Sequence, residues 1–136
     1  MAALTGARNT PVRDGRDFTR AVAAGVRIYQ GSIVCLTAGG YATPGATATT
    51  LKADGRAKSG VDNVAGGAGA VNVEVEKGVF RFANSAAGDA IAIADIGATA
   101  YIVDDQTVAK TNGGGTRSSA GTIVDVDAQG VWVRFV

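Results

Sequence analysis

The chain has 136 residues, a length that suits one domain with a single hydrophobic core. Its formal net charge of +1 comes from 13 basic and 12 acidic residues, without the basic excess of proteins that bind nucleic acid through phosphate contacts. Histidine is absent and Cys35 is the single cysteine, which excludes an intrachain disulfide and removes the commonest general base. We therefore expect no nucleic-acid partner, no metal and no cofactor.

Hydropathy argues against a membrane protein. No stretch approaches the roughly 18 apolar residues that cross a bilayer, and the opening residues lack the apolar segment of a signal peptide. We expect a soluble protein that is made in the cytoplasm and has no membrane partner.

The first 20 residues differ in character from the rest of the chain. They hold Pro11, which stops regular strand pairing. Basic residues outnumber acidic ones there: Arg8, Arg13, Arg16 and Arg20 stand against Asp14 and Asp17. This composition predicts an extended N-terminal arm over residues 1–20, followed by a single β-rich domain over 21–136. The arm would dock either on its own domain or on a neighbouring subunit.

Short strands divided by glycine-rich turns follow the arm. Glycine occurs 20 times, and no apolar pattern with the helical period continues over three turns. Four strand pairs are predicted from their turns: 25–29 with 32–37, 71–76 with 79–82, 101–103 with 107–109, and 122–127 with 131–135. The fold class is thus all-β, a small β-barrel or β-sandwich of short antiparallel strands, and the pattern leaves its topology open.

Catalytic chemistry finds little support in the sequence. Cys35 has no histidine to activate it and reads as a small core residue. The glycine-rich stretch 110–117 lacks the flanking strand, Gly-Lys-Ser/Thr ending and helix of a phosphate-binding loop. The acidic pairs 104–105 and 125/127 supply too few oxygens for a hard cation and cannot flank a sugar from one strand face. We predict that the protein is not an enzyme.

One aromatic side chain stands out as a candidate anchor. Along the last strand Val131, Val133 and Phe135 share one face, and Trp132 lies on the other. A tryptophan opposite the main apolar face is either an interface anchor or part of a second buried layer.

Six segments resemble, in their order along the chain, the structural cement (head decoration) proteins of tailed bacteriophages. They are NTPVRDG at 9–15, AVAAGV at 21–26, GVFRFAN at 78–84, ADIG at 94–97, YIVDD at 101–105 and GTIVDVDAQGVWV at 121–133. The resemblance covers nearly the whole chain and implies an all-β protein of the outer shell, added after the capsid lattice expands, often as trimers near three-fold positions. It carries over no catalytic residues.

We accordingly expect a cement protein on the outer surface of the virion that bridges subunits of the major capsid protein. Self-association would give a homotrimer, with a dimer as the other option. The expected contact residues are Leu4, Arg8, Arg13 and Arg16 for arm docking, with Phe18 or Trp132 as apolar anchors. The alternative is a carbohydrate- or receptor-binding β-module displayed on the virion, for which the sequence offers few aromatic residues.

Overall fold

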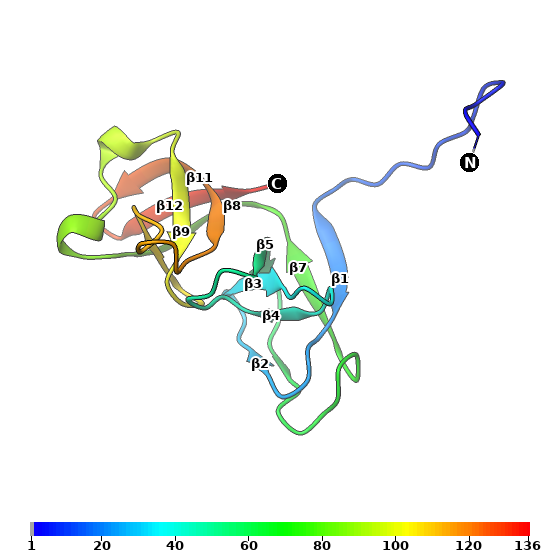
Figure 1. The fold of residues 1–136 in the computed structure, drawn as a ribbon, viewed down its shortest axis with the longest axis horizontal. Helices are drawn as coiled ribbons and strands as arrows, with labels where there is room; N and C mark the ends of the chain where they lie inside the picture. The colour runs from blue at the N-terminus through cyan, green and yellow to red at the C-terminus, as the bar shows by residue number, and fades with distance from the viewer. Residues whose placement is uncertain (1) are drawn as a thin grey trace.

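A computed structural model describes residues 2–136 and confirms the all-β fold class (Figure 1). Strands account for its regular structure apart from two short 3-10 turns. The elements are β1 (Asp17–Ala21), β2 (Arg27–Ile28), β3 (Ile33–Leu36), β4 (Ala42–Pro44), β5 (Lys52–Ala57), β6 (Val61–Asp62), β7 (Asn72–Glu76), β8 (Gly78–Asn84), η1 (Ala87–Asp89), η2 (Ile93–Asp95), β9 (Thr99–Ile102), β10 (Thr107–Ala109), β11 (Ser119–Asp127) and β12 (Gly130–Phe135).

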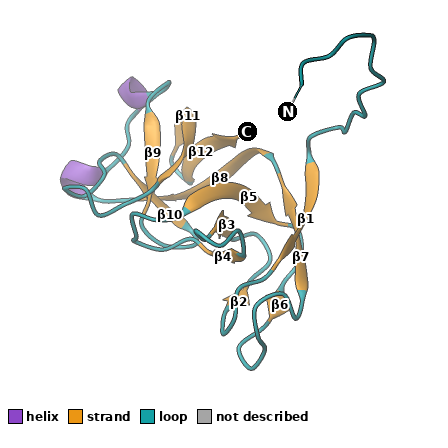
Figure 2. Ribbon diagram, turned by 45° about the vertical axis from the view of Figure 1, so that its right-hand side comes forward, coloured by secondary structure: helices purple, strands orange, loops and turns teal. Residues whose placement is uncertain are grey.

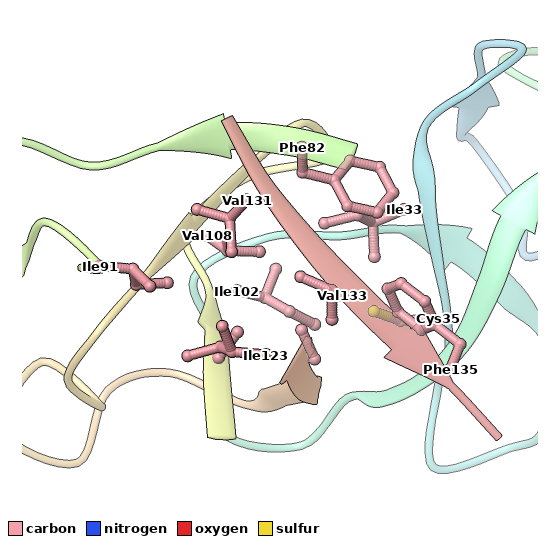
Figure 3. Close-up of a cluster of buried hydrophobic side chains, with 12 residues drawn as sticks. Ile33, Cys35, Phe82, Ile91, Ile102, Val108, Ile123, Val131, Val133 and Phe135 are labelled. Atoms are coloured by element: carbon pink, nitrogen blue, oxygen red, sulfur yellow. The ribbon is translucent and has the colours of Figure 1, made fainter. Parts of the chain in front are cut away.

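The C-terminal half forms a closed barrel in the order β10-β8-β12-β11-β9. Its pairs are antiparallel except β8 with β10, which run parallel. Side chains on alternate positions of these strands fill the interior, as Figure 3 shows for Phe82, Ile102, Ile123, Val131 and Val133. The aliphatic composition therefore suffices for a barrel of this small size.

The N-terminal half forms a five-stranded sheet in the order β1-β7-β5-β3-β4, beside the two-stranded pair β2-β6. Its own apolar cluster includes Val22, Ala57, Val73 and Val75, all fully buried. A parallel bridge from Val22 to Ala42 links the end of β1 to β4, so the sheet curls toward closure.

Strand β3 belongs to both hydrophobic clusters. Ile33 and Cys35 pack into the barrel cluster, and the intervening Val34 packs into the cluster of the five-stranded sheet. Successive strand residues point to opposite faces, so one buried strand with apolar residues at every position joins the two halves.

Two of the four predicted strand pairs are confirmed, namely β9 with β10 and β11 with β12. The other two are wrong. β2 pairs with β6 rather than with β3, and β7 pairs with β1 and β5 rather than with β8. Between β7 and β8 the chain passes from one sheet to the other at Lys77 and Gly78, whose φ of +151° lies in a region that favours glycine.

Residues 2–16 form the predicted arm, and they contain no strand and are exposed. Figure 1 shows this segment leaving the body at the start of β1 and running away from both halves, and Figure 2 shows that the segment is bent along its length. The predicted boundary at residue 20 needs correction, because Asp17–Ala21 is strand β1 and pairs along its length with β7.

The buried Cys35 thiol gives a first testable prediction. Burial, with a smaller contribution from the negative charge of Asp54, raises the pKa of the thiol to about 12. We expect a thiol reagent at mildly alkaline pH to label denatured protein rapidly and native protein only at the rate at which it opens. Mass spectrometry of timed samples measures both rates, and rapid labelling of the native protein would contradict the placement of Cys35 in the core.

Candidate functional site: the arm and its root

The arm makes no polar contact with the body until its last residue. Within residues 2–136, no hydrogen bond or ion pair joins 2–15 to the rest of the chain. Its two large apolar side chains are uncovered, Leu4 at 72% and Val12 at 93% exposure. Arg8 and Arg13 are likewise exposed. The arm therefore leaves two cations and two apolar side chains uncovered.

Arg16 fixes the point at which the arm leaves the body. Its guanidinium donates to Glu76 Oε1 at 3.0 Å, and its carbonyl accepts from the backbone N–H of Lys77 at 2.8 Å. Arg56 contacts the other oxygen of Glu76 at 3.3 Å. The hydrogen bond to Glu76 and its negative charge raise the pKa of Arg16. Arg16, predicted to dock on a partner, is thus already engaged within its own chain.

A second buried carboxylate, that of Asp54, lies close to this anchor. Arg20 donates to both of its oxygens, from Nε at 2.7 Å and from Nη2 at 3.0 Å, and Lys77 Nζ donates to Oδ1 at 3.0 Å. Burial acts to raise the pKa of Asp54, but the hydrogen bonds and charges of Arg20 and Lys77 outweigh it, so the pKa lies below its usual value. The cluster ties β1, β5 and the β7–β8 junction together.

A bulge in β5 aims Asp54 at its partners. Val34 pairs with Gly55 and Cys35 pairs with Ala53, which leaves Asp54 as the extra residue between two regular pairs. An extra residue changes the direction in which side chains point and lets a polar group turn toward neighbouring strands.

Phe18 lies within the same root. The Arg20 guanidinium carbon and Lys77 Nζ lie 4.8 Å and 5.6 Å from the centroid of its ring, distances typical of cation–π contacts. The side chain is half-buried. Phe18 is therefore packed against cations of its own chain, and only part of its surface is available as the predicted anchor.

Trp132 lies on the outer face of the barrel. Its indole N–H donates to Asp127 Oδ2 at 2.9 Å, and the Arg81 guanidinium lies 5.7 Å from its ring. The indole hydrogen bond, with backbone N–H groups of Gln129 and Gly130, lowers the pKa of Asp127. Trp132 is half-buried, so part of its side chain is covered and part is exposed.

The six predicted contact residues thus fall into three places. Arg16 and Phe18 come together at the root, Leu4, Arg8 and Arg13 lie along the free arm, and Trp132 lies on β12. The sequence reasoning missed Asp54 and Glu76. Strand alternation places Glu76 on the polar face with Glu74, and nothing in the stretch 46–57 marks a bulge.

Among residues 2–136, no three histidine, cysteine or acidic side chains gather in a way that would hold a metal ion. The same part of the chain contains no helix that is long and apolar enough to span a membrane. Comparisons with family models, curated proteins and solved structures found no match.

Proposed function

We propose that the protein is a capsid cement protein of a tailed bacteriophage, which binds the outer surface of the assembled head and bridges subunits of the major capsid protein. The observation that carries the proposal is the arm of residues 2–16, which leaves an otherwise well-packed body with its apolar and basic side chains uncovered. The six segments that resemble cement proteins support the same function.

The chemistry of the arm suits a protein surface with carboxylates. A guanidinium makes paired hydrogen bonds to a carboxylate, and Arg8 and Arg13 have no acidic partner within residues 2–136. Leu4 and Val12 supply apolar area that gains free energy when a partner covers it. An extended segment that becomes fixed on binding covers a large area for few residues.

Stabilisation of the shell follows from mass action. A protein that binds the assembled lattice and not free subunits shifts the equilibrium toward the lattice. A closed oligomer, for which we propose a homotrimer, would place several arms on neighbouring subunits, and linked attachments raise avidity by about 10² to 10⁴. Each arm then needs only a weak contact for the oligomer to stay bound to the shell.

Deletion of residues 2–15 tests the role of the arm. The truncated chain keeps Arg16 and β1, so it should fold, and its occupancy on purified expanded shells should fall at least about 100-fold because each linked attachment is lost. Cryo-electron microscopy of decorated shells, with sedimentation of bound protein, measures the occupancy.

A matched control replaces residues 2–15 by a glycine-serine segment of the same length and should fail to bind like the deletion. Full occupancy by either variant would contradict the role of the arm. Absence of shell binding by the intact chain, together with specific binding on a glycan array, would favour the alternative carbohydrate-binding function.

A further inference from the structure

A groove of about 610 Å³ lies where the two halves of the body meet, beside the end of β12. One wall is the segment 49–53, which leads into β5, and the other consists of the first half of β11 and the last residues of β12. Figure 1 shows the C-terminal end of β12 projecting between the barrel and the five-stranded sheet.

The groove is basic. Its lining contains Lys52, Arg117 and Arg134, and no acidic side chain. Arg117 is held in place, since its Nη1 donates to Asp89 Oδ2 at 3.2 Å, yet its buried Nε has no hydrogen-bond partner in the described chain. Lys52 and Arg134 are exposed and form no ion pair with any residue from 2 to 136. Two free cations therefore lie along the groove.

The wall formed by β11 also offers an extended strand. β9 pairs with β11 from Ser119 onward, whereas β12 pairs with it only from Thr122 onward. Residues 119–121 line the groove, and the end of β12 approaches Gly121 closely, since a Cβ atom there would collide with the backbone carbonyl of Arg134. Hydroxyl groups of Ser119 and Thr122 belong to the same lining. An extended peptide can lie along such a groove, with its side chains selected by the surrounding charges.

We infer that this groove binds an extended acidic segment of a partner protein, with Lys52 and Arg134 pairing with its carboxylates. The arm of a second copy does not suit the groove, because residues 2–16 hold three arginines against one aspartate. The inference rests on the proposed function for the identity of the partner, a capsid subunit. The groove and the arm both carry positive charge, so both would contact negatively charged surfaces of the partner.

The test uses the full chain and a fluorescein-labelled hexapeptide of alternating glutamate and valine, with a lysine-valine hexapeptide as the charge-reversed probe. Fluorescence anisotropy should show saturable binding of the acidic probe that weakens with added salt, and no binding of the basic probe. In Lys52→Glu/Arg134→Glu the affinity should fall at least about tenfold, because two attractions become repulsions. The neutral double variant Lys52→Gln/Arg134→Gln should lose less peptide affinity. It replaces the charge-reversed variant in the test if that variant does not fold.

The matched control is Arg27→Glu/Lys110→Glu, which changes the net charge equally at two exposed cations outside both the groove and the arm and should keep the peptide affinity. Equal losses in both reversed pairs, or no loss in the groove pair, would overturn the inference by showing that only overall charge matters. Self-association that the acidic peptide reverses would overturn the assignment to a capsid partner. Shell occupancy lost only in the arm deletion, without peptide binding, would overturn the groove and leave the proposed function standing.

Discussion

Replacing Asp54 with asparagine should lower the free energy of unfolding by about 2 to 3 kcal/mol. The substitution keeps the shape of the side chain but removes the charge that Arg20 and Lys77 share, and both cations are largely buried, with side chains 28% and 18% exposed. A buried cation that loses its counter-charge retains the full cost of its desolvation. Urea denaturation followed by circular dichroism measures the difference.

The difference in stability between wild type and this variant should also depend on pH. The pKa of Asp54 is lowered in the folded protein, so its contribution is complete above the pKa of an unfolded aspartate, about 4, and disappears as the pH falls through the folded value. The difference between wild type and variant should therefore be constant above about pH 5 and shrink in acid. Asp62→Asn is the control, because Asp62 pairs with Arg27 at an exposed site and its loss should cost less than about 0.5 kcal/mol. Equal effects of the two variants would contradict the importance of the buried cluster.

Substitution of Gly55 by alanine should destabilise the protein by about 3 kcal/mol. The added methyl group would collide with the backbone carbonyl of Glu76 on β7, and backbone atoms within a sheet cannot move aside as a flexible side chain can. Because the collision separates β5 from β7, it also disturbs Glu76 and the anchor of the arm. Thermal unfolding measured by calorimetry gives the size of the effect.

Gly67→Ala is the matched control for this glycine. Its added methyl group meets nothing within 4 Å, and the change in stability should stay within about 0.5 kcal/mol. A similar loss in both variants would contradict the role of the close approach between β5 and β7, because the lower entropy of the unfolded chain with alanine acts to stabilise the protein.

The sequence predicts the part of the fold that depends on local patterns. The hairpin of β11 and β12 has a short polar turn between two runs of alternating apolar residues, and both features act within one stretch of chain. The pairing of β7 with β1 joins residues about 55 positions apart, and alternation at β7 is satisfied equally well by any partner strand. Local patterns therefore place the strands and leave most of their neighbours undetermined.

The site divides in the same way. Leu4 and Arg8 are exposed, as expected from the sequence, because the segment around them is polar and is interrupted by Pro11. It has no periodic pattern of apolar residues that could form a buried face. The cluster of Asp54 with Arg20 and Lys77 requires a β-bulge and three separate segments, and neither leaves a mark in the sequence. Arg16 is a further example, because nothing in the sequence indicates that Glu76 binds its guanidinium.

The contacts of Arg16 fix the point on the body from which the arm extends. The segment 2–15 lies before that anchor, and a chain of fourteen residues spans about 50 Å when it is fully stretched. Under the proposed cement function, a body held at one position on the lattice could therefore contact a subunit beyond its immediate neighbour. The tether would tolerate local variation in subunit spacing, so curved and flat regions of a surface could be secured by the same molecule.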